Sequence, residues 1–232
     1  MEPFLDDNGK IYNPLEVIGR GECAEIIKAK DSGCDYVVIK KFNSNARANP
    51  RGRRKTNHTG KLREANPLVF KELKEISDKN DCLVRIISKG KTSQYEHFIL
   101  MEYIKGKNLE DYLNDQIIEE NNKLISCFEF GKALRTLHLN DIAHGDPHLA
   151  NVMIKSEKNT IGAVRVKFVD LNMLHSPKFV YCRKFNCFDS LNVLKQDLKN
   201  NLEYIGKGFI RCLEDFNYAY AEEFLKGYNY LY

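Results

Sequence analysis

The sequence lacks the features that mark membrane-spanning, secreted and disulfide-bonded proteins. Its 232 residues contain no run of eighteen apolar residues, and the opening MEPFLDDNGK has neither the basic region nor the apolar core of a secretory signal. The seven cysteines are odd in number and scattered, with no Cys-x-x-Cys pair, so neither a disulfide framework nor a zinc site is indicated. We therefore expect a soluble, intracellular protein with reduced thiols.

The composition is that of a globular protein. Hydrophobic residues make up 43% of the chain and charged residues 29%, which is enough for a sizeable core in one large domain or two small lobes. The formal net charge of +4 is modest for this length, so overall electrostatics do not favour nucleic-acid or membrane binding. No internal repeat is present.

One segment departs from this average composition. Residues 43–63 read NSNARANPRGRRKTNHTGKLR, with seven Lys or Arg and no acidic residue. Runs of like charge are usually solvated loops or insertions, which is the first interpretation here. Two further hypotheses are a binding site for an anionic or protein activator, and phosphorylation of Thr56 and Thr59.

The first half of the chain has the pattern of a small α+β unit. Short β-branched runs separated by Gly-rich or Asp-Ser-Gly turns predict an antiparallel meander. A helical pattern and two more strands follow. The predicted strands are 15–19, 24–30, 36–42, 82–88 and 97–103, with the helix over 61–77.

The second half has mainly helical periodicity. Asn108 is placed to cap a helix that begins at residue 109, and apolar residues recur at helical spacing within 125–140 and again from Leu198 to Phe209. Between these helices, 151–155 and 163–170 predict a β-hairpin. The polar stretch AHGDPHLANVMI, residues 143–154, thus falls on a loop between a helix and a hairpin, where a scaffold can aim side chains into a cleft.

The polar residues of that loop suit phosphoryl transfer. Asp146 and Asn151 lie close together in sequence, and Asp170 ends the second strand of the hairpin. Carboxylate and amide oxygens are the ligands that Mg²⁺ prefers, and one carboxylate could orient the attacking hydroxyl. A nucleotide would also need close backbone approach and a cation, which Gly19-Arg20-Gly21 and Lys40 could supply.

Five segments in this order resemble the protein kinase-like superfamily. VIGRGECAEI is similar to the glycine-rich loop, VVIK to the strand with the phosphate-binding lysine, FILMEYIKGKNLEDYL to the hinge, HGDPHLAN to the catalytic loop and VKFVDLN to the metal-binding strand. The resemblance runs from about residue 15 to about residue 213. It implies a bilobal kinase domain over 1–232, with an N-lobe over about 1–103 and a compact helical C-lobe over about 104–232.

The resemblance also assigns catalytic roles. Asp146 would be the catalytic base, and Asn151 and Asp170 would bind Mg²⁺. Lys40 would contact the ATP phosphates and pair with Glu64. Because Pro67 interrupts the helical pattern just after Glu64, Glu72 is kept as the alternative partner, and either Asp197 or Asp189 would anchor the catalytic loop.

For the nucleotide, the resemblance implies a glycine-rich loop made by Gly19, Gly21 and Ala24. Met101 would be the gatekeeper residue. The backbone of Glu102, Tyr103 and Ile104 would form the hinge that binds adenine. By contrast, His144 is expected to pack beneath the catalytic loop and bond to the backbone, because the resemblance gives proton handling to Asp146.

Several positions depart from the usual protein kinase pattern. Ala24 replaces the third glycine of the loop, Asp170 is followed by Leu-Asn instead of Phe-Gly, and no Ala-Pro-Glu follows within a segment that is short for peptide docking. His148 stands where protein Ser/Thr kinases usually have Lys. The resulting motif HGDPH is similar to the loops of aminoglycoside and choline phosphotransferases. Activation by loop phosphorylation is therefore not expected.

The sequence as a whole favours an ATP- and Mg²⁺-dependent protein serine/threonine kinase with a protein substrate. The shortened C-lobe resembles the minimal effector kinases that some bacteria inject into host cells and that host partners regulate, which would place the protein in host cytoplasm. Two alternatives stay open. One is a small-molecule or lipid kinase, and the other is a pseudokinase that binds a partner without phosphoryl transfer.

Overall fold

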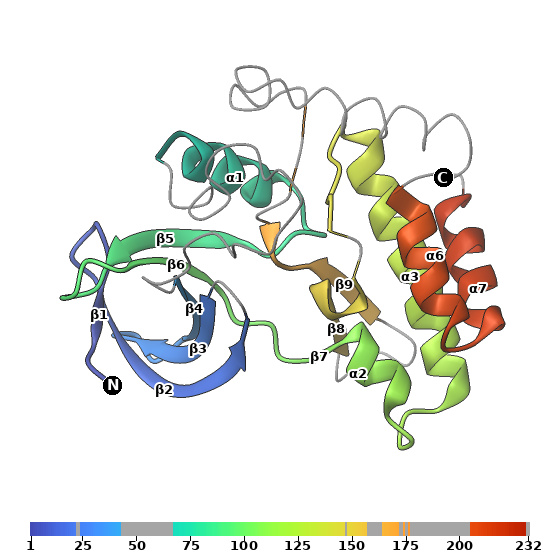
Figure 1. Cartoon of the computed structure of the whole chain (residues 1–232), viewed down its shortest axis with the longest axis horizontal. Coiled ribbons are helices and arrows are strands. Elements are labelled where there is room, and N and C mark those ends of the chain that lie inside the picture. The colour runs from blue at the N-terminus through green and yellow to red at the C-terminus, as the bar shows by residue number, and fades with distance from the viewer. Residues whose placement is uncertain are drawn as a thin grey trace, which may run out of the picture. The chain divides into compact units, whose positions relative to one another are not determined.

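The structure is a computed structural model that describes residues 1–21, 24–42, 67–146, 148–156, 164–171, 174, 176 and 205–230. It divides into two compact units (Figure 1). The first comprises Met1–Lys79 and Val84–Tyr103, and the second comprises Asn80–Leu83 and Ile104–Tyr232. Among the described helices, none combines the length and apolar character needed to cross a membrane.

The first unit is built on a sheet of six antiparallel strands, one more than the five predicted. In spatial order these are β1 (Phe4–Leu5), β2 (Ile11–Arg20), β3 (Ala24–Asp31), β4 (Tyr36–Phe42), β6 (His97–Glu102) and β5 (Ile86–Lys91). The additional strand is β1, whose two residues pair with the start of β2. Two residues are too few to show the apolar alternation by which strands are recognised in a sequence.

The two ends of this sheet meet. Asp6, just after β1, forms a bridge to Gly90 of β5, and the Asp7 N–H donates to the Lys89 carbonyl at 2.9 Å. A Cβ on Gly90 would lie only 2.6 Å from the Leu5 carbonyl oxygen, so this approach needs glycine. The sheet is therefore closed on itself, which removes its exposed edges.

The closed sheet surrounds an apolar core. Inward-facing residues of neighbouring strands gather there, with Phe4 packed edge-on against Phe98 at a ring separation of 5.1 Å. The period-2 pattern on which the strand predictions depend thus corresponds to burial on one face. The core residues are Phe4, Tyr12, Ile27, Ala29, Val37, Ile39, Phe98 and Leu100.

Helix α1 (Pro67–Lys79) completes this unit as described. Its described part starts at Pro67. The helix predicted over 61–77 is thus observed from Pro67, while residues 61–66 lie outside the described residues. The next strand begins at Ile86 and not at Cys82 as predicted, because residues 80–83 form a turn that joins the second unit.

The second unit combines helices with a small three-stranded sheet. Its strands are β7 (Lys107–Asn108), β8 (Val152–Ser156) and β9 (Val164–Phe168), so the predicted hairpin of the last two is confirmed. The helices are α2 (Leu109–Asn114), α3 (Glu120–Leu139), α6 (Ile205–Glu214) and α7 (Tyr218–Tyr228), with a 3₁₀ turn η1 at Leu149–Asn151. Asn108 caps α2 as expected, its side chain accepting from the Asp111 N–H at 2.7 Å.

Close packing of α3 against α7 forms the centre of this unit (Figure 1). Gly131 and Gly227 make it possible, since a Cβ on either would come within 2.0 Å of a carbonyl oxygen on the facing helix. The predicted apolar face of α3 is buried, and its Phe130 touches the rings of Phe168, Phe209 and Phe224. This core supports β9 and the polar loop that precedes η1.

Candidate active site

The polar loop is held from below by His144. This side chain is fully buried, with Nε2 at 2.9 Å from the Val169 carbonyl oxygen and Nδ1 at 3.2 Å from that of Asp146. Burial lowers the pKa of His144, which favours the neutral ring. Gly145 follows with φ of +76°, a left-handed conformation that favours glycine. The histidine therefore links the loop to the end of β9.

Asp146 and Asn151 lie side by side in this loop. The Asn151 amide nitrogen donates to Asp146 Oδ2 at 2.8 Å and lies 3.3 Å from the Asp146 carbonyl oxygen. The carboxylate keeps a second oxygen, Oδ1, that this amide does not use. The amide oxygen of Asn151 is likewise not part of either contact. The pair thus combines a fixed carboxylate, able to orient or accept a proton, with an oxygen that could bind a cation.

Asp170 is linked to the same loop through the backbone. The N–H of its neighbour Val169 donates to the Asn151 carbonyl oxygen at 2.9 Å. Asp170 itself has φ of +54°, a left-handed conformation that is uncommon outside glycine but better tolerated by Asp than by most residues. Such backbone conformations are concentrated at functional sites. The structure thus brings together the loop and the strand end that were expected to supply the metal ligands.

His148 stands at the rim of this group. Its Nε2 lies 3.5 Å from Asp146 Oδ1, and its side chain is 71% exposed. The imidazole therefore contacts the carboxylate oxygen that Asn151 leaves open.

The glycine-rich hairpin lies in the first unit, between β2 and β3. The Gly21 N–H donates to the Ala24 carbonyl at 2.9 Å, which closes the hairpin around a two-residue tip. Gly19 pairs with Ile26 lower down the hairpin. The tip residues Glu22 and Cys23 lie outside the described residues.

Lys40 and Lys41 are neighbours on β4 whose side chains point to opposite faces of the sheet. Lys40 is only 6% exposed, and its ammonium lies 5.6 Å from the centre of the Phe42 ring. Lys41 lies on the same face as the core residues Val37 and Ile39, 3.0 Å from Glu25 and 3.6 Å from Glu96. Lys40 is therefore the buried lysine of the two, whereas Lys41 is held by acidic side chains.

The predicted gatekeeper and hinge lie at the end of strand β6 and just after it. Met101 is buried within β6, and Glu102 is its last residue. The Glu102 carboxylate accepts from the Arg85 N–H at 2.8 Å, while its own N–H donates to the Arg85 carbonyl at 3.0 Å. Tyr103 packs against Tyr36 at a ring separation of 5.8 Å. Ile104 is buried and belongs to the second unit.

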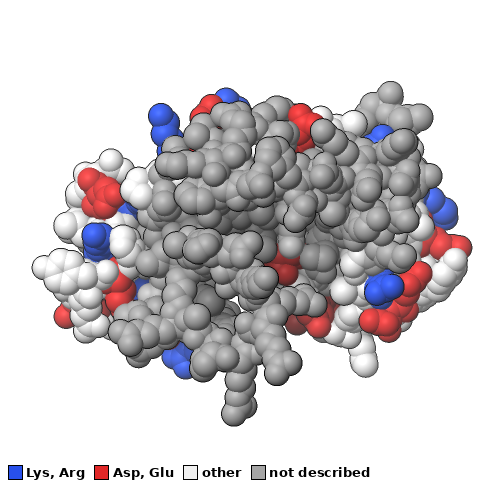
Figure 2. Space-filling view, turned by 45° about the horizontal axis from the view of Figure 1, so that its top comes forward, with Lys and Arg blue, Asp and Glu red and all other residues white. Residues whose placement is uncertain are grey.

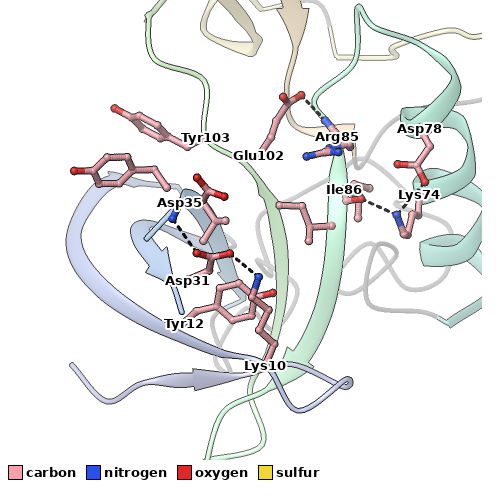
Figure 3. A pocket seen from close by; sticks show the side chains of 13 residues that line it. Lys10, Tyr12, Asp31, Asp35, Lys74, Asp78, Arg85, Ile86, Glu102 and Tyr103 are labelled. Atoms are coloured by element: carbon pink, nitrogen blue, oxygen red, sulfur yellow. Dashed lines mark hydrogen bonds and ion pairs between the residues drawn. The ribbon is translucent and has the colours of Figure 1, made fainter. Parts of the chain in front are cut away.

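A pocket of about 420 Å³ opens beside Glu102 and Tyr103 (Figure 3). Its lining mixes both charge signs, and two of its cations already bind acids: Lys10 to Asp31 at 2.5 Å and Lys74 to Asp78 at 2.9 Å. Neither the glycine hairpin nor Lys40 lines it. This pocket therefore differs from the expected nucleotide site, and its balanced charge favours no one class of ligand.

Some predicted site residues lie outside the described residues. These are Glu64, both candidate anchoring residues Asp189 and Asp197, and the basic segment 43–63. The alternative partner of Lys40, Glu72, lies in α1. The ion pairs of Lys41 were not predicted, because they depend on which residues face each other across three strands.

Comparison with known protein families shows to which family the chain belongs. A model of the protein kinase domain matches residues 12–177, well over half of the chain. The chain belongs to the protein kinase family. The kinase-like fold is therefore established.

Curated relatives of this kinase domain include several kinases. The KEOPS complex subunit Bud32 of Pyrococcus abyssi is 28% identical over 56% of this chain and 48% of its own length. Serine/threonine-protein kinase PAK 1 of Mus musculus is 26% identical over 65% and 25%, and a probable KIN1 homolog of Enterocytozoon bieneusi 20% over 70% and 24%. The chain thus spans about half or less of these relatives.

Among solved structures, that of vaccinia related kinase 3 superposes with a TM-score of 0.49 at 17% identity. The superposition covers 79% of this chain and 52% of that one.

Proposed function

We propose that this kinase domain transfers the γ-phosphoryl group of ATP, with Mg²⁺, to a serine or threonine hydroxyl of a protein. The observation that carries the proposal is the pairing of Asp146 with Asn151 in a loop linked by Val169 to Asp170. A chain of the protein kinase family with these three side chains retains the residue types that transfer requires.

On the acceptor side, Asp146 is the catalytic base. The hydrogen bond from Asn151 fixes one carboxylate oxygen and leaves the other to orient the acceptor hydroxyl and take its proton. His144 holds the loop backbone in this position. The substitution Asp146→Asn removes the proton acceptor but keeps a side chain that can form hydrogen bonds.

On the nucleotide side, Gly19, Gly21 and Ala24 approach the phosphates through the backbone, and Lys40 neutralises their charge. Glu64, or Glu72 in its place, orients Lys40. Met101 borders the adenine pocket, and the backbone of residues 102–104 binds the base. Catalysis in this scheme comes from positioning and from charge neutralisation.

The residues present fit the Mg²⁺ that a protein kinase uses. Among the described residues, no three His, Cys, Asp or Glu side chains come together in a metal-binding group. A kinase needs no such group, because one carboxylate and one amide oxygen share the ion with phosphate oxygens. Asp170 and the Asn151 oxygen would hold it. When bound, Mg²⁺ offsets the charge that develops on the transferred phosphoryl group.

One observation favours a different class of phosphate acceptor. His148 contacts Asp146 where protein Ser/Thr kinases usually have Lys, which supports a small-molecule or lipid acceptor. The serine/threonine kinases among the relatives favour a protein acceptor. On the face shown in Figure 2, the described Lys and Arg residues lie among Asp and Glu, so charge on that face selects neither class.

The proposal extends to the chain as a whole. Residues 1–232 form one minimal kinase domain whose shortened segment after Asp170 is not controlled by loop phosphorylation. An anionic or protein partner would act on the basic segment 43–63 of an effector-like enzyme. Neutralising Arg51, Arg53, Arg54 and Lys55 together should then abolish activation by that partner, and unchanged activation would contradict this part.

An acceptor screen tests the proposal. The purified protein is given labelled ATP and Mg²⁺ with generic protein acceptors in one series and with metabolite or lipid hydroxyl compounds in another, and ATP consumption is measured in both. Label in protein serine or threonine supports the proposal. ATP consumption with metabolites alone supports the small-molecule kinase, and nucleotide binding with no turnover under any condition supports a pseudokinase.

A further inference from the structure

The glycine-rich hairpin is flanked by a row of charged residues on the sheet face that also carries the apolar core, at the end of that face near the hairpin. Arg20 of β2 lies directly opposite Glu25 of β3, and Glu25 lies directly opposite Lys41 of β4. Arg20 Nε is 3.4 Å from Glu25 Oε1, and Lys41 Nζ is 3.0 Å from Glu25 Oε2. Glu25 therefore binds a cation with each carboxylate oxygen, one from either neighbouring strand.

The far end of this row is anchored. Lys41 also lies 3.6 Å from Glu96 Oε2, just before β6. Glu96 is fixed by the β5–β6 turn, where its N–H donates to Thr92 Oγ1 at 3.1 Å and its carbonyl accepts from the Thr92 N–H at 2.9 Å. The carboxylates raise the pKa of Lys41, with Glu25 the largest cause. Its positive charge is thus held between two acids.

The two cations of this row belong to elements that the proposed function uses. Arg20 stands between the two glycines of the hairpin, and Lys41 is the immediate neighbour of Lys40. Glu25 follows Ala24, whose carbonyl accepts the hydrogen bond that closes the hairpin. A change in the Glu25 side chain is therefore transmitted to the phosphate-binding backbone on one side and to the lysine strand on the other.

We infer that Glu25 is a positioning residue that fixes the glycine-rich hairpin relative to the strand of Lys40. The inference rests on the proposed function and adds to it a determinant of nucleotide affinity. Glu25 touches no reacting atom in this scheme. It acts through Arg20 and Lys41, and it restricts the hairpin to the conformation that receives phosphates.

The expected effect is moderate. Arg20 is 73% exposed, while the side chains of Glu25, Lys41 and Glu96 are 27%, 23% and 15% exposed, so solvent screens one pair strongly and the others less. Exposed pairs contribute little individually. Loss of both contacts of Glu25 should raise the KM and Kd for ATP about three- to tenfold, with kcat nearly unchanged because the catalytic loop is untouched.

The test compares Glu25→Gln with Glu16→Gln. Glu16 is a matched control, since it forms a similar cross-strand pair with Lys28 at 3.2 Å on the same hairpin but away from the glycines. ATP affinity is measured by calorimetry with Mg²⁺, together with KM, kcat and the melting temperature. The inference predicts weaker ATP binding in Glu25→Gln alone, at a melting temperature close to that of wild type.

Three outcomes would overturn the inference. Equal ATP affinity in Glu25→Gln and wild type would show that the row does not position the hairpin, and equal losses in both variants would show a nonspecific charge effect. A fall in kcat with unchanged KM would assign Glu25 a different role. Wild-type protein that binds no ATP would instead refute the proposed function itself, which distinguishes the two failures.

A second variant covers the case in which Glu25→Gln folds poorly. Arg20→Gln removes only the exposed partner in the hairpin and should raise KM in the same direction by a smaller factor. In the double variant Arg20→Gln/Glu25→Gln, the loss should be smaller than the product of the two single losses, because both act through one contact. Fully multiplicative losses would contradict the inference.

Discussion

The two functional loops of this kinase domain are held by different kinds of interaction. The catalytic loop is fixed by buried hydrogen bonds, from the neutral His144 ring to a backbone carbonyl and from the Val169 N–H to the Asn151 carbonyl oxygen. The glycine-rich hairpin is flanked by ion pairs of partly exposed side chains, centred on Glu25. Breaking a buried hydrogen bond lowers the free energy of unfolding substantially, whereas breaking an exposed ion pair lowers it little.

This difference matches what each loop has to do. A catalytic base needs one geometry throughout the reaction, and tenths of an ångström affect proton transfer. A hairpin that covers a nucleotide has to open for exchange, and weak contacts permit this. The comparison therefore predicts that damage to the catalytic loop lowers turnover or stability strongly, while damage to the ion-pair row changes nucleotide affinity moderately.

The largest expected effect comes from removing a ligand or a phosphate-binding cation. Asp170→Ala and Lys40→Ala should each lower kcat/KM by about 10³-fold or more, because each deletes a charge that stabilises the transferred phosphoryl group. Circular dichroism should show that both variants remain folded. Full activity in either variant, measured by phosphoryl transfer, would contradict the site assignment.

The second-largest effect is expected from removing His144, the buried residue that anchors the catalytic loop. His144→Ala removes the ring that hydrogen-bonds to the loop backbone and creates a cavity, so the free energy of unfolding should fall by about 2–4 kcal/mol. His148→Ala is the matched control on the same loop, 71% exposed, and should change stability by about 0.5 kcal/mol or less. Urea denaturation measures both. Similar losses in the two variants would show that His144 is not the anchor.

The second unit should also be sensitive to acid through a different histidine. His138 of α3 is fully buried against Tyr228 of α7, with Nδ1 at 2.7 Å from the phenol oxygen, and its buried Nε2 has no hydrogen-bond partner among the described residues. Burial, with a smaller effect of Arg135, lowers the pKa of His138 from 6.5 to about 3. The unfolded chain therefore binds this proton below pH 6.5, and the folded protein does not until about pH 3.

Stability should then be complete above pH 6.5 and should fall as the pH drops from 6.5 towards 3. Each pH unit in that window costs about 1.4 kcal/mol for one such group. Urea denaturation at about pH 7.5 and about pH 5 should show a loss of about 2 kcal/mol in wild type. His138→Gln should lose less, with the buried His144 accounting for part of the remainder. Equal losses would exclude His138 as the cause.

The smallest expected effect concerns the ion pairs beside the glycine-rich hairpin. A double-mutant cycle of Glu25→Gln with Lys41→Gln should give a coupling free energy of about 0.5–1 kcal/mol for stability. High salt should reduce this coupling, because the pair is partly exposed. A coupling of several kcal/mol would mean that the row is a structural element comparable to the buried network of the catalytic loop.

Local patterns in the sequence predicted most of the elements but not the long-range closures. The β8–β9 hairpin, the Asn108 cap and the buried face of α3 depend on neighbouring residues, and all were predicted. Closure of the first sheet depends on Asp6, whose carboxylate accepts from Ser88 at 2.7 Å across 82 residues of chain. No local pattern announces such a pair, and the same holds for the strand β1 that precedes it.

The candidate site shows the same division. Asp146, Asn151 and Asp170 were predicted because their types and spacing carry chemistry, and the structure brings their loop and strand end together. The partners of Lys41 could not be predicted, since any acid on a neighbouring strand could have faced it until the register was known. Residues whose types and spacing suggest chemistry are thus easier to identify from sequence than the contacts made across strands.

The most direct test of the central claim is transfer of labelled γ-phosphate from ATP with Mg²⁺ by wild type and by Asp146→Asn, side by side. The asparagine preserves size and hydrogen bonding but cannot accept the proton, so stability should be nearly unchanged. The account predicts label in an acceptor with wild type and none with the variant. Equal transfer by both proteins would contradict it, because Asp146 would then not be the catalytic base.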